Sequence, residues 1–148
     1  MNKLLCLPLV FLWIPGVCAE QQASGHKTYA DALNHRSETV CGELSSYRKF
    51  SACESSILEE ADALLNDQYK ELVDYLDPAN RKNLVRAQRL WLKFRDADCS
   101  FAEPRSDENS SWISANRTSC LARTTIERLR HLEQYNASWN KGCNGCPW

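Results

Sequence analysis

Hydrophobic residues recur every three or four positions along three long stretches of this chain, which is the spacing of one face of an α-helix. The first stretch begins after Cys53 and is expected to end at Asp77-Pro78, because proline disfavours a helical conformation in the residue before it. Its apolar positions are Ile57, Leu58, Ala61, Leu64, Leu65, Tyr69, Leu72, Tyr75 and Leu76. We therefore predict one long amphipathic helix in this region.

The second stretch predicts a helix that starts near Asn80 and ends before Pro104 and the polar sequence SDENSSW. Its apolar face is expected to carry Leu84, Ala87, Leu90, Trp91, Phe94, Ala97 and Phe101. We expect Leu90, Trp91 and Phe94 to belong to the core. The third stretch predicts a helix from about Arg117 to Tyr135, with Leu121, Leu129, Leu132 and Tyr135 along its stripe.

These patterns predict an all-α protein, a small helical bundle of three main helices with a short N-terminal helix between Ser37 and Cys53. The polar residues 20–37 are expected to form a loose arm, and the tail that ends in NKGCNGCPW is rich in helix breakers and is expected to be irregular. The predicted division of the chain is a leader at 1–19, the arm at 20–37, the helical domain at 38–137 and the tail at 138–148.

The first 19 residues have the layout of a secretory signal: Lys3, an apolar run from Leu4 to Ile14, a Pro15-Gly16 break and the small residue Ala19. We therefore expect a periplasmic or secreted protein. The alternative is a lipoprotein acylated at Cys18, which the bulky Val17 disfavours. Removal of a leader with one lysine and no acid changes the net charge from -1 to -2, and such a chain is not expected to bind nucleic acid.

Six cysteines follow the leader, an even number that favours disulfides in a small exported domain. They are Cys41, Cys53, Cys99, Cys120, Cys143 and Cys146. Composition does not choose among the pairings. Cys143 and Cys146 form a CxxC sequence that we interpret as a local disulfide. A thiol oxidoreductase site and a metal site are the alternatives, although the first lacks a βαβ setting and the second lacks two further ligands.

Charge is segregated between the first two predicted helices. Residues 54–77 contain eight acids and one lysine, whereas residues 80–95 contain six bases and no acid. Antiparallel packing of the two helices would let these charges complement each other. The alternative is that the acidic face binds a cationic partner outside the molecule. The residues assigned to that face are Glu59, Glu60, Asp67, Glu71 and Asp74.

Several polar residues lie in or beside the apolar stripes and need partners, because an unpaired buried charge is costly. We expect them to form a structural network in which Arg95 or Arg128 pairs with Asp96 or Asp98. The members of this predicted network are Gln88, Arg95, Asp96, Asp98, Thr125 and Arg128. The three histidines belong to no recognisable catalytic or metal-binding arrangement, so we expect neither an enzyme nor a cofactor.

The sequence resembles the LprI-type lysozyme inhibitor family. The matching residues are Cys53, Ala61-Asp62, Leu65-Asn66, Tyr69, Leu72, the block AQRLWLKFRDADC at 87–99, Cys120-Leu121, Thr125, Arg128 and Leu132. The resemblance covers about residues 41–132. It implies a compact helical domain in which Cys41 pairs with Cys53 and Cys99 with Cys120.

The resemblance further implies an exported inhibitor that occludes the cleft of a cationic muramidase, with lysozyme as the partner. The acidic face is our own electrostatic inference and is not carried over from the family. The alternative is an envelope-associated structural or adaptor protein without inhibitory activity. Two features depart from the family pattern: the loop before Cys120 lacks a glycine-serine pair, and the tail with Cys143 and Cys146 is extra.

Overall fold

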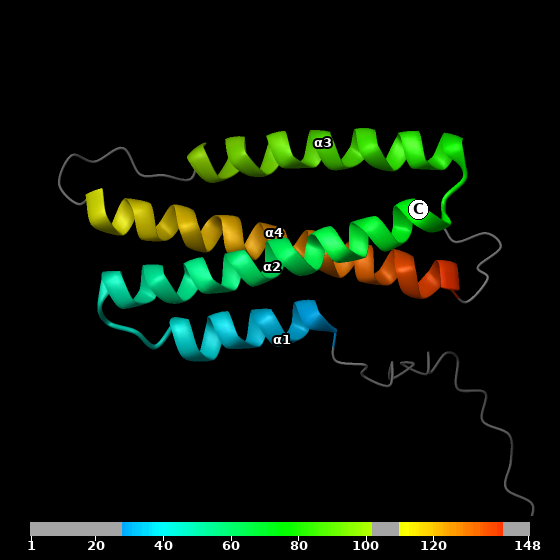
Figure 1. The fold of residues 1–148 in the computed structure, drawn as a ribbon. Coiled ribbons are helices and arrows are strands. Elements are labelled where there is room, and N and C mark those ends of the chain that lie inside the picture. Colours follow the sequence, from blue (N-terminus) through cyan, green and yellow to red (C-terminus); the bar gives the residue numbers. More distant parts are fainter. Residues whose placement is uncertain (1–27, 102–109, 141–148) are drawn as a thin grey trace, which may run out of the picture.

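A computed structural model describes residues 28–101 and 110–140 as helices joined by short connections (Figure 1). The elements are α1 at Tyr29–Arg36, the π-helix η1 at Ser37–Cys41, α2 at Tyr47–Tyr75, α3 at Pro78–Phe101 and α4 at Ser110–Asn140. No strand occurs in the described part of the chain. The all-α prediction is therefore confirmed.

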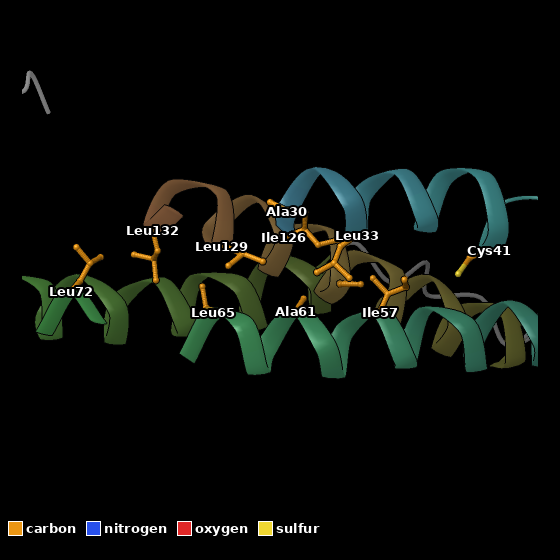
Figure 2. Close-up of a cluster of buried hydrophobic side chains, with 11 residues drawn as sticks. Ala30, Leu33, Cys41, Ile57, Ala61, Leu65, Leu72, Ile126, Leu129 and Leu132 are labelled. Atoms are coloured by element: carbon orange, nitrogen blue, oxygen red, sulfur yellow. The ribbon is translucent and has the colours of Figure 1, made fainter. Parts of the chain in front are cut away.

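Helix α4 is the central element, and α2 packs along most of its length (Figure 1). Helices α1 and α3 lie on opposite sides of the α2–α4 pair. Side chains from α1, α2 and α4 meet in the core shown in Figure 2. Its largest apolar members, Ile57, Ile126, Leu129 and Leu132, are almost completely excluded from water. Burial of side chains of this size stabilises a domain by about 1.5–3 kcal/mol each.

The break between α2 and α3 lies where the sequence predicts it. Leu76 has an extended backbone, and Pro78 occupies the first position of α3, where its missing N–H costs nothing. The Asp77 carboxylate caps the new helix by accepting hydrogen bonds from the backbone N–H groups of Ala79 at 2.9 Å and Asn80 at 3.1 Å. These bonds, the one from Asn80 above all, lower the pKa of Asp77.

The prediction of a loose arm is wrong for residues 28–36, which cap and form α1; residues 20–27 lie outside the described part of the chain. Thr28 and Asp31 form a capping box, and the Glu133 carboxylate accepts the Tyr29 N–H at 2.8 Å. Ala30 and Leu33 are buried. Two apolar residues in a short polar segment give too weak a periodicity to predict a helix. These two residues are buried because α1 packs against α4.

Two other helices also extend beyond the predicted limits, α2 at its N-terminal end and α4 at both ends. Helix α2 begins at Tyr47, before Cys53, and α4 runs from Ser110 to Asn140 and so includes residues expected in the preceding loop and in the irregular tail. The remainder of the tail, 141–148, lies outside the described residues. Polar ends of long helices carry little periodic signal, since their stability comes from the packed middle.

The expected core position is wrong for much of the α3 stripe, although Leu84 and Trp91 pack against the core. Leu90 and Phe94 are 56% and 59% exposed, and Phe101 is 88% exposed, whereas Trp91 is partly buried against the core. Helix α3 turns a different side towards α4, the side that carries Cys99, Arg95 and Gln88. The disulfide and the polar network described below hold that orientation.

Candidate functional site

A cleft of about 580 Å³ separates α2 from α3. Most of the polar and aromatic residues that line it belong to the blocks on which the family resemblance rests. The lining residues are Asp62, Leu65, Asn66, Tyr69, Val85, Gln88, Arg89, Leu92 and Arg95. The ion pair between Arg95 of α3 and Asp62 of α2 joins the two helices across this cleft.

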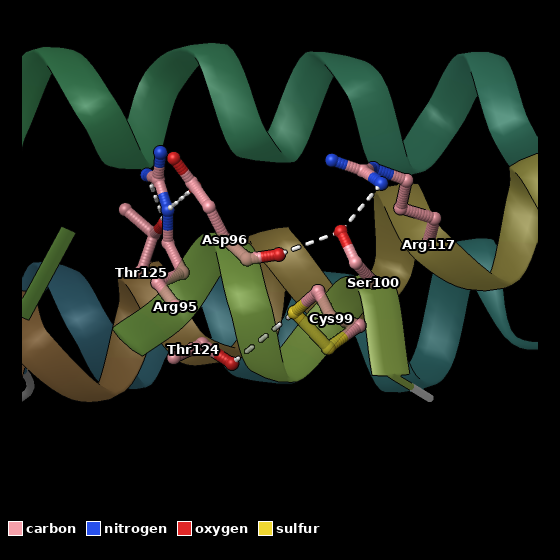
Figure 3. Close-up of a disulfide and its surroundings, with 8 residues drawn as sticks. Arg95, Asp96, Cys99, Ser100, Arg117, Thr124 and Thr125 are labelled. Carbon is pink, nitrogen blue, oxygen red and sulfur yellow. Dashed lines mark hydrogen bonds and ion pairs between the residues drawn. A yellow bond between two sulfur atoms is a disulfide. The ribbon is translucent and has the colours of Figure 1, made fainter. Parts of the chain in front are cut away.

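Arg95 joins three helices at one end of the cleft, and Figure 3 shows its contacts with Asp96 and Thr125. Its Nη1 donates hydrogen bonds to Asp62 Oδ1 on α2 and to Thr125 Oγ1 on α4, both at 3.2 Å. Its Nε donates to Asp96 Oδ1 at 3.0 Å. The Arg95 side chain is only 14% exposed, whereas the two carboxylates are 44% and 57% exposed. The guanidinium thus crosslinks the bundle while its acidic partners stay hydrated.

Arg128 makes a second crosslink from α4 to α3. Its Nε donates to Gln88 Oε1 at 2.9 Å. The guanidinium groups of Arg128 and Arg95 lie 6.0 and 5.3 Å from the centre of the Trp91 ring, within the range of cation–π attraction. Burial lowers the pKa of Arg128. Trp91 is therefore held between two arginines rather than in a purely apolar layer.

The structure brings together five of the six residues of the predicted network: Gln88, Arg95, Asp96, Thr125 and Arg128. Asp98 is exposed and lies outside it. The network also contains Asp62, which the charge pattern assigned only to an acid-rich helix. Its position one residue after the buried Ala61 was the available signal, because such a residue lies at the edge of a helical stripe.

Two disulfides are present among the described residues, Cys41–Cys53 and Cys99–Cys120, as the resemblance implied. The first ties η1 to α2, and the second ties the end of α3 to α4 (Figure 3). Cys143 and Cys146 lie outside the described residues. Within the described residues no group of three histidine, cysteine, aspartate or glutamate side chains is placed to hold a metal ion.

Helix α2 carries a row of acidic side chains on the flank away from α3. At 100° per residue, Glu60, Asp67, Glu71 and Asp74 fall within an arc of about 60°, and each lies about 120–180° around the helix from Asp62. We call these four residues the acidic row. Glu59 lies outside it, between Asp62 and the row and about 60° from Asp62.

Two of the four acids in the row have an ion-pair partner among the described residues. Glu60 forms an ion pair with Arg36 of α1, and Asp67 lies 3.7 Å from Lys70. Among the described residues, Asp62 is the one acid of α2 that forms an ion pair with α3. Antiparallel charge compensation between α2 and α3, which the sequence left open, is therefore limited to this pair.

None of the described helices is long and apolar enough to span a membrane. The chain matches no curated protein and no solved structure. It does match the family model described as "Lysozyme inhibitor LprI", over residues 37–132, a region that contains both disulfides, the Arg95 and Arg128 crosslinks and the acidic row. The chain belongs to the LprI lysozyme inhibitor family.

Proposed function

We propose that this protein is exported and binds a cationic muramidase, whose substrate cleft it occludes. Membership of the family supports an inhibitor that works by binding rather than by catalysis. Two disulfides in a small domain are typical of proteins that fold in an oxidising compartment.

The acidic row is the observation that carries the proposed mode of binding. Of the acids in α2, Glu54 is buried and Asp62 is bound by Arg95. Asp77, just after the helix, caps α3. The others remain at the surface, and four of them share one flank. A concentration of negative charge on one side attracts a cationic protein and orients it before contact.

Glu59 lies outside this flank and is therefore expected to contribute less to partner binding than the four residues of the row. The rigid α2–α4 pair fixes the row in space, so a partner would meet preorganised charges rather than side chains on a loop. An envelope adaptor without inhibitory activity is the rival function.

The test is lysis of a peptidoglycan suspension by a cationic animal-type lysozyme, with the oxidised protein added across a salt series. The informative variant carries Asp67→Lys, Glu71→Lys and Asp74→Lys. Its matched control carries Glu43→Lys, Asp98→Lys and Glu127→Lys, which changes the net charge equally at exposed positions away from the row.

Dose-dependent protection is expected for the wild type and the control. The row variant should need about tenfold more protein at low salt, a difference that shrinks as salt rises, because complementary surface charge is screened by ions. Equal loss in both variants would reject the row as the docking site. No protection by folded wild-type protein at any dose would reject inhibition and favour the adaptor.

A further inference from the structure

The outer surface of α3 combines an apolar stripe with a row of bases. Leu90, Phe94, Ala97 and Phe101 all lie exposed within an arc of about 60°. We call these four residues the outer stripe. It faces away from the bundle, because Arg95, Gln88 and Cys99, which contact α4, lie about 130–170° around the helix from its centre.

The basic row lies directly beside the outer stripe. Its members are Lys82, Arg86, Arg89 and Lys93, which are exposed and fall within the adjoining arc of about 60°. None of the four has an ion-pair partner among the described residues. Asp98 flanks the stripe on its other side, and Asp96 is already paired with Arg95.

From this arrangement we infer that α3 docks, lying flat, on an anionic lipid bilayer. An exposed helix with a narrow apolar stripe and adjacent lysines and arginines is the form that binds in the plane of a membrane interface: the apolar side chains enter the acyl boundary and the bases contact anionic headgroups. The outer stripe and basic row together extend over about 28 Å of helix.

The charge pattern disfavours a second copy of the chain as the occupant. Antiparallel pairing of two outer stripes about a two-fold axis would place each basic row against its own copy. Parallel pairing would set the basic row against a flank whose one acid among the described residues is Asp98. An anionic surface, in contrast, offers negative charge along the whole row.

The distribution of charge over the molecule fits the same orientation. The acidic row lies on the flank of α2 that faces α1, as its Glu60–Arg36 pair shows, and α1 and α3 are on opposite sides of the bundle (Figure 1). Docking through α3 would therefore keep the acidic row away from the like-charged lipids. This inference does not depend on inhibition of a muramidase, because it concerns a different face.

Sedimentation with vesicles tests the inference, using the oxidised chain from Glu20 onward, which contains every described helix. The lipids are phosphatidylcholine alone and phosphatidylcholine mixed with phosphatidylglycerol. The stripe variant is Leu90→Ser, Phe94→Ser and Phe101→Ser, with Val40→Ser and Tyr75→Ser as the control for exposed apolar residues. The basic variant is Lys82→Gln, Arg86→Gln and Lys93→Gln, with Lys49→Gln, Lys70→Gln and Arg123→Gln as its control.

The wild type and both controls should bind the mixed vesicles and not the neutral ones. The basic variant should lose about 100-fold in partition coefficient, and the stripe variant at least about tenfold. In a Phe94→Trp variant, brominated lipids should quench more of the fluorescence than in the wild type.

Three results would overturn the inference. The first is no binding of the wild type to mixed vesicles. The second is binding that the stripe and basic variants retain. The third is a dimer in solution that the stripe variant abolishes, which would assign the outer stripe to a second copy.

Discussion

Replacement of Arg95 by alanine should be the most informative single change in the polar network. The side chain is 14% exposed and links α2, α3 and α4 through Asp62, Asp96 and Thr125. The three partners differ in what they lose. Asp62 and Asp96 return to water, whereas the Thr125 hydroxyl is fully buried and is left without the donor that Arg95 supplies.

The expected destabilisation is about 3 kcal/mol. An orphaned buried hydroxyl costs about 1–3 kcal/mol. Each half-exposed ion pair contributes at most about 1 kcal/mol, because water screens it. The contact with the Trp91 ring adds about 0.5–1 kcal/mol. The buried hydroxyl, rather than the ion pairs, therefore dominates the loss.

Urea unfolding of the oxidised protein, followed by far-ultraviolet circular dichroism, measures this free energy. A double-mutant cycle with Thr125→Val separates the contributions, because valine removes the hydroxyl and keeps the branched shape. The double variant should be more stable than the two single losses predict, by about 1 kcal/mol. Arg89→Ala, at an exposed α3 position, should change stability by less than about 0.5 kcal/mol.

Two results would refute this reasoning. A loss below about 1 kcal/mol for Arg95→Ala would show that the crosslink is not a structural element. Additive losses in the cycle would show that Thr125 does not depend on Arg95 for its hydrogen bond.

Three further predictions concern α3. Replacing Cys99 and Cys120 by alanine should destabilise the protein by about 3 kcal/mol by freeing a loop of 21 residues in the unfolded chain, and a shift below about 1 kcal/mol in urea unfolding would contradict this. Phe94→Ser should lower the free energy of unfolding by less than about 0.5 kcal/mol, whereas Leu129→Ala should lower it by about 2–5 kcal/mol. Similar losses for the two variants would show that Phe94 is part of the core. The pKa of Asp77 is lowered in the folded protein, so its carboxylate stabilises the fold above the ordinary pKa of 3.8, and this stabilisation is lost as the pH falls further. Asp77→Ala should therefore weaken the dependence of the unfolding free energy on pH in the acid range. An unchanged pH dependence would reject the cap.

The long helices and the presence of disulfides could be predicted from local patterns and composition. A proline after Asp77, the long stripes of α2 and α4 and the even number of cysteines depend only on neighbouring residues or on composition. Most of the polar network was also accessible, because a charged residue inside an apolar stripe needs a partner wherever the helix packs. The pairing of Asp62 with Arg95 was not, since nothing local joins the two residues across 33 positions.

The orientation of α3 was decided by tertiary structure alone. Its 3.6-residue period defines an apolar side, and from this pattern alone that side would be expected to face the core. Instead Cys99 must meet Cys120, and Arg95 and Gln88 must meet Thr125 and Arg128, on the opposite side.

The sequence by itself determined that the chain forms long amphipathic helices with segregated charge and disulfides, because periodicity, helix breakers and composition act locally. Only the tertiary structure decided that α1 joins the core, that the acidic row faces away from α3 and that the outer stripe remains in water. A helix can rotate about its axis without changing its own pattern, so its rotation is fixed by covalent and hydrogen-bonded partners far away along the chain.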